Sequence, residues 1–328
     1  MKKNSVRQRS RWKRRLRIAL GWIVFLAIGI LVYLYFPRSL PAKPLSFQLI
    51  SHRGVHQTFP LDNLQNDTCT AKIIDPPAHN FLENTIDSIS EAFKHGADIV
   101  EIDIHPTTDN QLAVFHDWTI DCRTNGKGIT HEQSMTSLKK LDLGYGYTAD
   151  GGKTYPFRGK AIGLMPTLTE VLQTFPDRKL AINQKDKFTK TVQLVAQTLK
   201  EYPRSQRQNI YFLSGEEQFS LLQKEIPEVR QTLPSRNDIK ACSLNYLGMV
   251  FSGKISESCN RTAFAMPARY LKYIPGWPSL FLSQARQVNL KVYVADVDTP
   301  EDLATVKGLP INGIVTNKIE VISPLVKR

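Results

Sequence analysis

The chain has 328 residues, enough for one large α/β domain with additions, and it carries a formal net charge of +13. Nine of its cations lie within residues 1–17, which contain no acidic residue, so the remainder of the chain is only slightly basic. Because the charge is concentrated in a tail and no basic groove with interleaved aromatic residues follows, the composition argues against a nucleic-acid-binding protein.

An uncharged apolar run over residues 18–36 follows the basic tail. A helix of this length just spans a hydrocarbon core of about 30 Å. Trp12 and Trp22 near one end, and Tyr33 and Tyr35 near the other, lie where interfacial aromatic residues are usually found. The positive-inside rule then places the N-terminus in the cytoplasm and the body outside it, in the periplasm if the cell is Gram-negative.

A cleaved signal peptide is the alternative for this apolar run. The run is longer than a typical signal core, and residues 37–40 lack a clear small-x-small cleavage site, which favours an uncleaved anchor. Three prolines in the following segment indicate a short, stiff linker that holds the body near the bilayer. The predicted parts are a cytoplasmic tail (1–17), a transmembrane helix (18–36), a linker (37–46) and a globular body (47–328).

Eight short apolar runs with the character of strands occur along the body, and most are separated by helical patterns. A further run at 112–116 is separated from its predecessor only by the turn at 106–111, too short for a parallel crossover, so these two should form an antiparallel hairpin. Eight alternating β and α units predict a closed (β/α)8 barrel, the TIM-barrel fold. The predicted barrel strands are 47–51, 97–104, 180–185, 210–214, 231–233, 263–266, 291–297 and 313–316.

Two long insertions interrupt the predicted barrel, at 55–81 and at 117–165. Barrel loops of this kind carry specificity, so we expect both insertions to cover a pocket at the carboxyl ends of the strands. The second is followed by a helix that begins with a capping-box pattern at Thr167 and Glu170.

Four cysteines fit an oxidising compartment. Of the three possible connectivities, Cys69 with Cys122 and Cys242 with Cys259 is favoured, and four separate thiols are the alternative.

Glu101 and Asp103 are two residues apart on a predicted strand, so both side chains point to the same face. Near the carboxyl end of a barrel strand, that face is the mouth of the active site. Two such carboxylates repel each other unless a cation lies between them, and oxygen ligands suit Ca²⁺ or Mg²⁺, and less specifically Mn²⁺. An exposed acidic strand face is the alternative, but apolar neighbours on both sides favour a site.

Two histidines, His52 and His116, each end an apolar strand and together can supply a general base and a general acid. Arg53 offers a planar fork of donors for phosphate oxygens, and a salt bridge to Glu83 is its alternative or additional role. Glu83 opens a helix and is predicted to cap it, to orient Arg53 or to join the metal shell. Lys185 ends a strand and is predicted to neutralise phosphate charge, with a solvated strand end as the alternative.

The other five histidines have no comparable context and are expected in loops or on the surface. One of them follows Asp103 at i+2 and could share its face. These histidines are His56, His79, His95, His105 and His131.

Taken together, four segments resemble the glycerophosphodiester phosphodiesterase family. The resemblance runs from about residue 47 to residue 326 and is most specific in its first half. The four segments are His52-Arg53-Gly54, Glu83-Asn84-Thr85, Gly96 through Asp103, and Val114 through Asp117. Looser matches are 137–141, 165–172 and 313–316.

This resemblance implies a TIM barrel that hydrolyses glycerophosphodiesters to glycerol 3-phosphate and an alcohol. It implies that His52 and His116 are the acid–base pair and that Glu101 and Asp103 bind a divalent metal. It further implies that Arg53 and Lys185 contact the phosphate.

The sequence departs from the family pattern at three positions. Asn183 stands where the family usually has a glutamate that also binds the metal, so Asn183 is predicted to coordinate through its carbonyl oxygen with one negative charge fewer. Ala295 replaces a common tryptophan, which is expected to widen the pocket. Asn317 replaces a common aspartate.

Three functions are therefore weighed from the sequence. The first is a membrane-anchored, metal-dependent phosphodiesterase acting on glycerophosphodiesters or, because of the anchor, on lysophospholipids. The second is a phospholipase D-type barrel enzyme that forms a cyclic phosphate. The third is a binding protein with weakened catalysis, which Asn183 suggests and the intact histidine and carboxylate pairs oppose.

Overall fold

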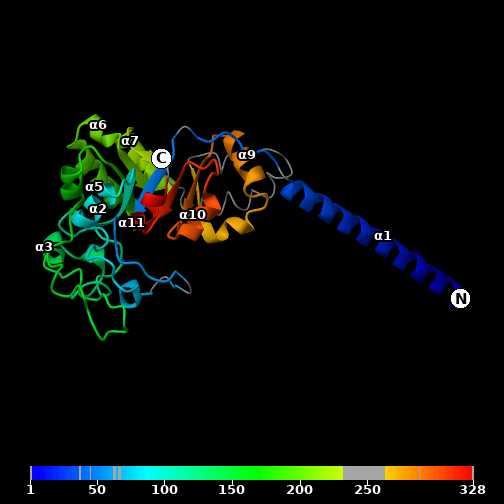
Figure 1. Ribbon diagram of the computed structural model, residues 1–328, viewed down its shortest axis with the longest axis horizontal. Helices are drawn as coiled ribbons and strands as arrows, with labels where there is room; N and C mark the ends of the chain where they lie inside the picture. The colour runs from blue at the N-terminus through cyan, green and yellow to red at the C-terminus, as the bar shows by residue number, and fades with distance from the viewer. Residues whose placement is uncertain are drawn as a thin grey trace.

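The computed structural model describes residues 2–36, 38–44, 46–61, 64–65, 68–231, 263–287 and 289–326. The body is a curled sheet of parallel strands with helices against its outer face, and one long helix stands apart from it (Figure 1).

The parallel strands pair side by side in the order β6-β5-β4-β2-β1-β9-β8-β7. Seven of the predicted strands agree with the observed bounds to within two residues, and the run at 231–233 meets β6 at Gln231 and otherwise lies outside the described residues. The prediction of a (β/α)8 barrel is confirmed. The strands are β1 (Gln48–His52), β2 (Ile99–Pro106), β4 (Lys179–Gln184), β5 (Ile210–Leu213), β6 (Arg230–Gln231), β7 (Ala263–Pro267), β8 (Lys291–Ala295) and β9 (Gly313–Thr316).

The predicted hairpin is also present. Strand β3 (Leu112–Val114) pairs antiparallel with β2, with Ile104 opposite Val114. The hairpin continues past β3, because the backbone N–H of Phe115 donates to the carbonyl oxygen of Asp103 at 3.0 Å. His116 is therefore folded back beside the carboxylates of β2.

Helices pack their apolar sides against the sheet and form the main hydrophobic core with it. Thr85 caps α2, and the predicted capping box of Thr167 and Glu170 begins α4. The helices are α1 (Lys2–Tyr35), α2 (Ile86–Lys94), α3 (Met135–Leu138), α4 (Leu168–Thr174), α5 (Thr189–Lys200), α6 (Arg204–Arg207), α7 (Glu216–Glu225), α9 (Ser279–Gln287), α10 (Pro300–Val306) and α11 (Ile319–Ile322), with 3₁₀ turns η1 (Thr70–Ile73), η2 (Thr130–Glu132), η4 (Ala268–Tyr273) and η5 (Ser323–Leu325).

The two insertions pack against each other and build a second hydrophobic cluster beside the barrel. Tyr147 and Phe157 from one insertion and Ala71 and Ile74 from the other are all buried in it. A disulfide between Cys69 and Cys122 joins the two insertions, which confirms that predicted pairing. The predicted pair of Cys242 and Cys259 lies outside the described residues.

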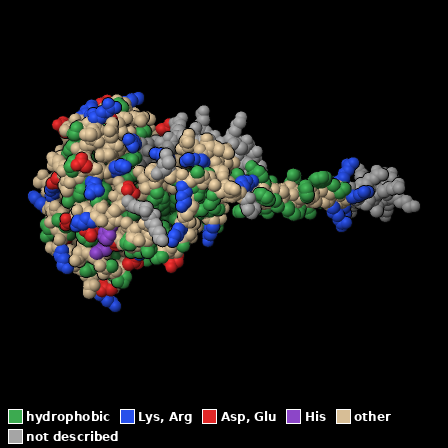
Figure 2. Space-filling view, turned by 45° about the horizontal axis from the view of Figure 1, so that its top comes forward, with side chains coloured by type: hydrophobic (Ala, Val, Ile, Leu, Met, Phe, Trp, Pro, Cys, Tyr) green, Lys and Arg blue, Asp and Glu red, His purple; other side chains and the backbone are tan. Residues whose placement is uncertain are grey.

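Helix α1 contains a stretch, Trp12–Tyr35, that is long and apolar enough to cross a membrane. Its side chains are almost all exposed, and Figure 2 shows hydrophobic side chains along it with lysines and arginines gathered toward its N-terminal end. This agrees with the predicted apolar helix, and the orientation across a membrane stays a prediction.

Candidate active site

Strand pairing brings the predicted site residues to one end of the barrel. His52 on β1 lies opposite Glu101 on β2, and Asp103 lies opposite Asn183 on β4. Because the strands are parallel and in register, these four side chains come from adjacent positions at the carboxyl edge of the sheet. Lys185 follows β4 directly, as predicted for a residue at a strand end.

Asp103 is the centre of the charged network and has no exposed surface. One of its carboxylate oxygens, Oδ1, lies 3.3 Å from Lys185 Nζ and accepts from Asn183 Nδ2 at 3.0 Å. The other, Oδ2, lies 3.3 Å from Arg53 Nε and accepts from Asn84 Nδ2 at 3.0 Å. The two predicted phosphate-binding residues, Arg53 and Lys185, thus converge on one aspartate.

The pKa values of the two buried carboxylates of β2, Glu101 and Asp103, are shifted in opposite directions. Burial and the negative charge of Asp103 raise the pKa of Glu101 to about 8. Burial also disfavours the ionised form of Asp103, but Lys185, His116 and Arg53 outweigh it and lower the pKa of that carboxyl. The pair therefore carries one negative charge near neutral pH unless a further cation joins it.

This pair, with Asn183, supplies the kind of oxygen ligands that Ca²⁺ and Mg²⁺ bind. The observation in favour of a cation is the burial of both carboxylates on one face of β2, because a cation would relieve the repulsion between them. Within the described part of the chain no three acidic, histidine or cysteine side chains are arranged to hold a metal. Asn183 fits as the third ligand through its amide oxygen, after its amide group turns away from Asp103.

Glu83, the fourth predicted ligand, lies between two arginines. Its Oε1 accepts from Arg53 Nη1 at 3.2 Å, and its Oε2 lies 3.3 Å from Arg123 Nη2. Opposing these cations, burial raises the pKa of Glu83, but Arg123 and Arg53 lower it overall. These contacts match the predicted role in which Glu83 orients Arg53.

His52 is held by an amide. Its Nδ1 lies 2.7 Å from Asn317 Oδ1, and the Nδ2 of the same amide donates to Asp298 Oδ2 at 2.7 Å. Since Asp298 fixes which end of the amide faces the ring, Nδ1 of His52 carries the hydrogen and Nε2 keeps its lone pair. Nε2 lies 3.8 Å from Glu101 Oε2, on the side of the site.

His116, in contrast, is held by a carboxylate. Its Nδ1 lies 2.7 Å from Asp117 Oδ1, and Asp117 Oδ2 lies 3.1 Å from Arg123 Nε. Burial and then Arg53 lower the pKa of His116, as they do for His52. A carboxylate partner stabilises an imidazolium and an amide partner does so far less, which suits His116 to hold a proton and His52 to accept one.

The backbone at Arg53 and Gly54 forms a tight, strained turn after β1. Arg53 has a φ of 61° and Gly54 a φ of 79°, both in the left-handed region. The Arg53 N–H donates to the Glu101 carbonyl oxygen at 3.0 Å, and the Arg53 carbonyl oxygen accepts from the N–H of Asn84 at 3.0 Å. This tight turn ties β1 to β2 and to the start of α2.

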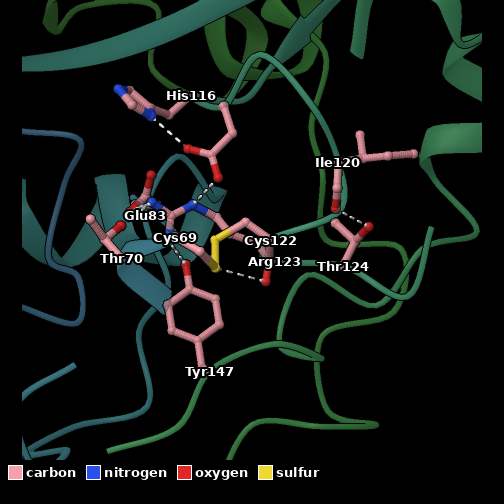
Figure 3. Close-up of a disulfide and its surroundings, with 10 residues drawn as sticks. Cys69, Thr70, Glu83, His116, Ile120, Cys122, Arg123, Thr124 and Tyr147 are labelled. Carbon is pink, nitrogen blue, oxygen red and sulfur yellow. Dashed lines mark hydrogen bonds and ion pairs between the residues drawn. A yellow bond between two sulfur atoms is a disulfide. The ribbon is translucent and has the colours of Figure 1, made fainter. Parts of the chain in front are cut away.

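Arg123 is a buried member of the network that the sequence analysis did not identify. Figure 3 shows its guanidinium beside the disulfide, with Glu83, Thr70 and Tyr147 around it. Asp117 contacts both Arg123 and His116 and so connects them. Although burial lowers the pKa of Arg123, Glu83 and Tyr147 raise it overall, so Arg123 stays charged.

A cavity of about 200 Å³ opens at the carboxyl ends of the barrel strands, next to His52 and Glu101. Apolar side chains of the barrel strands, among them Ala295, form one part of its wall, and polar side chains form the rest: His52, Glu101, Asn183, Asp296 and Asn317. The predicted widening at Ala295 is consistent with its place in this wall.

One of the five remaining histidines, His105, lies within strand β2 and is fully buried, so the prediction of a loop or surface position was wrong for it. The β2–β3 hairpin and Trp118 enclose His105. His56 is also buried, at 2% exposed, but it lies in the loop after β1, as predicted. His105 had been singled out because it follows Asp103 at i+2. It does lie near the site, with its Nε2 3.3 Å from the carbonyl oxygen of His116.

Comparison with known proteins decides the family. The model of the glycerophosphoryl diester phosphodiesterase family matches residues 52–321, most of the chain. The chain belongs to this family. The match begins at His52, the first residue of the site, and extends past β9 into α11.

Several relatives carry the family's name. A glycerophosphodiester phosphodiesterase of Caldanaerobacter subterraneus is 27% identical over 254 residues, 76% of this chain and 94% of the relative. A glycerophosphodiester phosphodiesterase of Bacillus subtilis is 31% identical over 158 residues, 46% of this chain and 45% of the relative. Like these relatives, the chain is a phosphoric diester hydrolase of the glycerophosphodiester phosphodiesterase type.

Solved structures of the family share the fold. The glycerophosphoryl diester phosphodiesterase domain of a Mycobacterium tuberculosis protein aligns with a TM-score of 0.63 at 15% identity, over 85% of this chain and 99% of that one. An Oleispira antarctica phosphodiesterase in complex with the product sn-glycerol-3-phosphate aligns with a TM-score of 0.58 at 17% identity, over 87% and 97%.

Proposed function

We propose that this protein is a membrane-anchored, metal-dependent phosphodiesterase that hydrolyses glycerophosphodiesters, and lysophospholipids where the bilayer presents them. The products are glycerol 3-phosphate, or a lysophosphatidate, and an alcohol. The observation that carries the proposal is a pair of imidazoles, one held by Asn317 and one by Asp117, at the end of the barrel where an arginine and a lysine converge on Asp103.

Each residue has a step in this reaction. Arg53 and Lys185 bind the phosphate oxygens and stabilise the negative charge that develops on them. His52 removes the proton from the attacking hydroxyl or water through Nε2, and the oxygen forms its bond to phosphorus. His116 donates a proton to the alcohol oxygen as the P–O bond to the leaving group breaks.

Glu101, Asp103 and Asn183 would hold a divalent cation, Ca²⁺ or Mg²⁺. The bound cation would supply polarisation of a phosphoryl oxygen and would offset developing negative charge. Glu83 contributes by fixing Arg53, and any direct contact with the metal would require it to leave an arginine.

Membrane attachment is supported by the exposed apolar surface of α1 and by the few residues between Tyr35 and β1. A human relative named lysophospholipase D is 29% identical over 127 residues, 38% of each chain. The disulfide supports an oxidising compartment, which agrees with a body on the extracytoplasmic side. A short tether would hold the catalytic cavity close to lipids.

The proposed activity has a direct test. The full chain in detergent should release glycerol 3-phosphate from glycerophosphocholine and lysophosphatidate from lysophosphatidylcholine with Ca²⁺ or Mg²⁺, and EDTA should abolish both. Phosphorus NMR of the products should show a phosphomonoester, whereas a cyclic phosphate would indicate the phospholipase D-type reaction. Activity confined to soluble diesters would remove the lipid substrate, and no turnover with any metal would favour a binding role.

Asn183 gives a second expected result, on metal affinity. Asn183→Glu adds a negatively charged ligand and should tighten Ca²⁺ binding about tenfold or more, because the charge of the ligand set tunes Ca²⁺ affinity. Isothermal titration of metal-free protein measures this without substrate. Gln173→Glu, at an exposed position of α4, adds the same charge away from the site and should leave the affinity unchanged. Equal affinity of wild type and Asn183→Glu would contradict a metal at this position.

A further inference from the structure

Arg123 lies outside the catalytic cavity but is connected to both halves of the catalytic machinery. Its side chain is 3% exposed. Its Nε lies 3.1 Å from Asp117 Oδ2, and its Nη2 lies 3.3 Å from Glu83 Oε2. The other oxygens of these two carboxylates hold His116 at 2.7 Å and Arg53 at 3.2 Å. Arg123 is thus one carboxylate away from an imidazole and from a phosphate-binding guanidinium.

The same guanidinium also donates hydrogen bonds to one residue of each insertion. Nη2 donates to Thr70 Oγ1 at 2.9 Å, and Nη1 donates to the Tyr147 hydroxyl at 3.1 Å. Thr70 follows Cys69 in the chain, and Arg123 follows Cys122, so the disulfide joins the two backbone segments that meet at this guanidinium (Figure 3).

The backbone around Arg123 leaves little room for it to move. The carbonyl oxygen of Arg123 accepts from the N–H of Gly146 at 3.1 Å. A Cβ at Gly146 would collide with the backbone of Cys122, so these segments are in the closest contact that glycine permits. Tyr147, the next residue, is thereby held against Arg123.

We propose that Arg123 is a positioning residue for His116 and Arg53, and that the Cys69–Cys122 disulfide holds it in place, so that turnover depends on the oxidised state of this pair. Without a fixed Arg123, two buried carboxylates at Asp117 and Glu83 lose their shared cation and turn away from the groups they orient. The inference rests on the proposed function, because the readout is hydrolysis of a glycerophosphodiester.

The chemical step that tests the disulfide is thiol–disulfide exchange with dithiothreitol. The cystine gains two electrons and two protons and becomes two thiols, while dithiothreitol loses them and closes its own disulfide. Thiol titration of the unfolded protein confirms that the bond has opened.

The experiment is a double-mutant cycle on the full chain with glycerophosphocholine as substrate. Arg123→Lys keeps the charge but cannot bridge two carboxylates, and it should lower kcat about 10- to 100-fold, the usual range for residues that orient a ligand or catalytic group. Asp117→Asn should lower kcat to a similar degree. The loss in the double variant should be smaller than the product of the two single losses, because both changes remove the contact between Arg123 and Asp117.

The second part of the experiment opens the disulfide between Cys69 and Cys122. Dithiothreitol, and separately the Cys69→Ser/Cys122→Ser variant, should lower the kcat of the wild type to about the level of Arg123→Lys and should change Arg123→Lys little further. Circular dichroism of each sample verifies that the barrel remains folded. Multiplicative effects in the cycle, or full kcat after the disulfide has opened, would overturn this inference alone. An inactive oxidised wild type would overturn the proposed function and this inference together.

Discussion

Replacement of His116 by alanine should lower kcat for glycerophosphocholine about 10²- to 10⁴-fold, the contribution usual for a general acid or base. The loss should be much smaller on a glycerophosphodiester whose leaving group is nitrophenol, since a nitrophenolate leaves without being protonated. His116 is paired with Asp117, which stabilises the protonated imidazole that the acid role needs. Steady-state rates on the two substrates measure the difference.

His52→Ala should lose a similar factor on both substrates, because the attacking oxygen must be deprotonated whatever the leaving group is. His52 is held by an amide, and its Nε2 keeps a lone pair on the side of the site. His95→Ala, at the outer end of α2, is the matched control and should leave both rates unchanged. If His52→Ala is the variant that recovers on the nitrophenyl substrate, the two roles are exchanged.

The parts of the site that local pattern predicts are those carried on single strands. Glu101 and Asp103 share a face because side chains alternate along a strand. His52 ends β1, and His116 lies two residues past the end of β3. The hairpin was predictable for the same reason, because a turn too short for a crossover leaves only antiparallel pairing. Asp117 directly follows His116, but adjacency in the sequence does not show that its carboxylate turns back to bind the imidazole.

The side chains that hold the catalytic residues in place could not be predicted, because they contact those residues from distant parts of the chain. His52 and its partner Asn317 are separated by 265 residues, and Arg123 reaches Thr70 across 53. Asn317 was noted as a departure from the family pattern, but nothing in the sequence shows that Asp298 orients its amide.

Burial by insertions was equally hidden from the sequence. A segment without regular periodicity, such as 117–165, gives no signal of which of its side chains will be buried. In the structure it builds its own hydrophobic cluster with the first insertion, and that cluster encloses Tyr147 beside Arg123. The disulfide was predictable only as one of several pairings, and its position next to Arg123 became visible with the fold.

Gly54→Ala should destabilise the protein by about 2–5 kcal/mol and should also lower turnover. The φ of 79° at Gly54 costs an L-residue about 1–2 kcal/mol. An added Cβ would also lie only 2.7 Å from the backbone carbon and 2.8 Å from the carbonyl oxygen of Ser88, which α2 holds in place, and overpacking of this kind costs about 1–3 kcal/mol. Chemical denaturation measures the free energy of unfolding.

The chain offers a matched control in Gly159, whose φ of 78° is nearly the same and around which a Cβ would meet nothing within 4 Å. Gly159→Ala should therefore show the backbone strain alone, about 1–2 kcal/mol, with unchanged kcat. The excess cost of Gly54→Ala reports the contact with Ser88, and its loss of kcat reports displacement of Arg53, whose carbonyl oxygen accepts from Ser88 Oγ at 3.1 Å. Equal destabilisation by the two changes, with turnover intact, would mean that the turn after β1 can shift away from α2 without moving the phosphate-binding arginine.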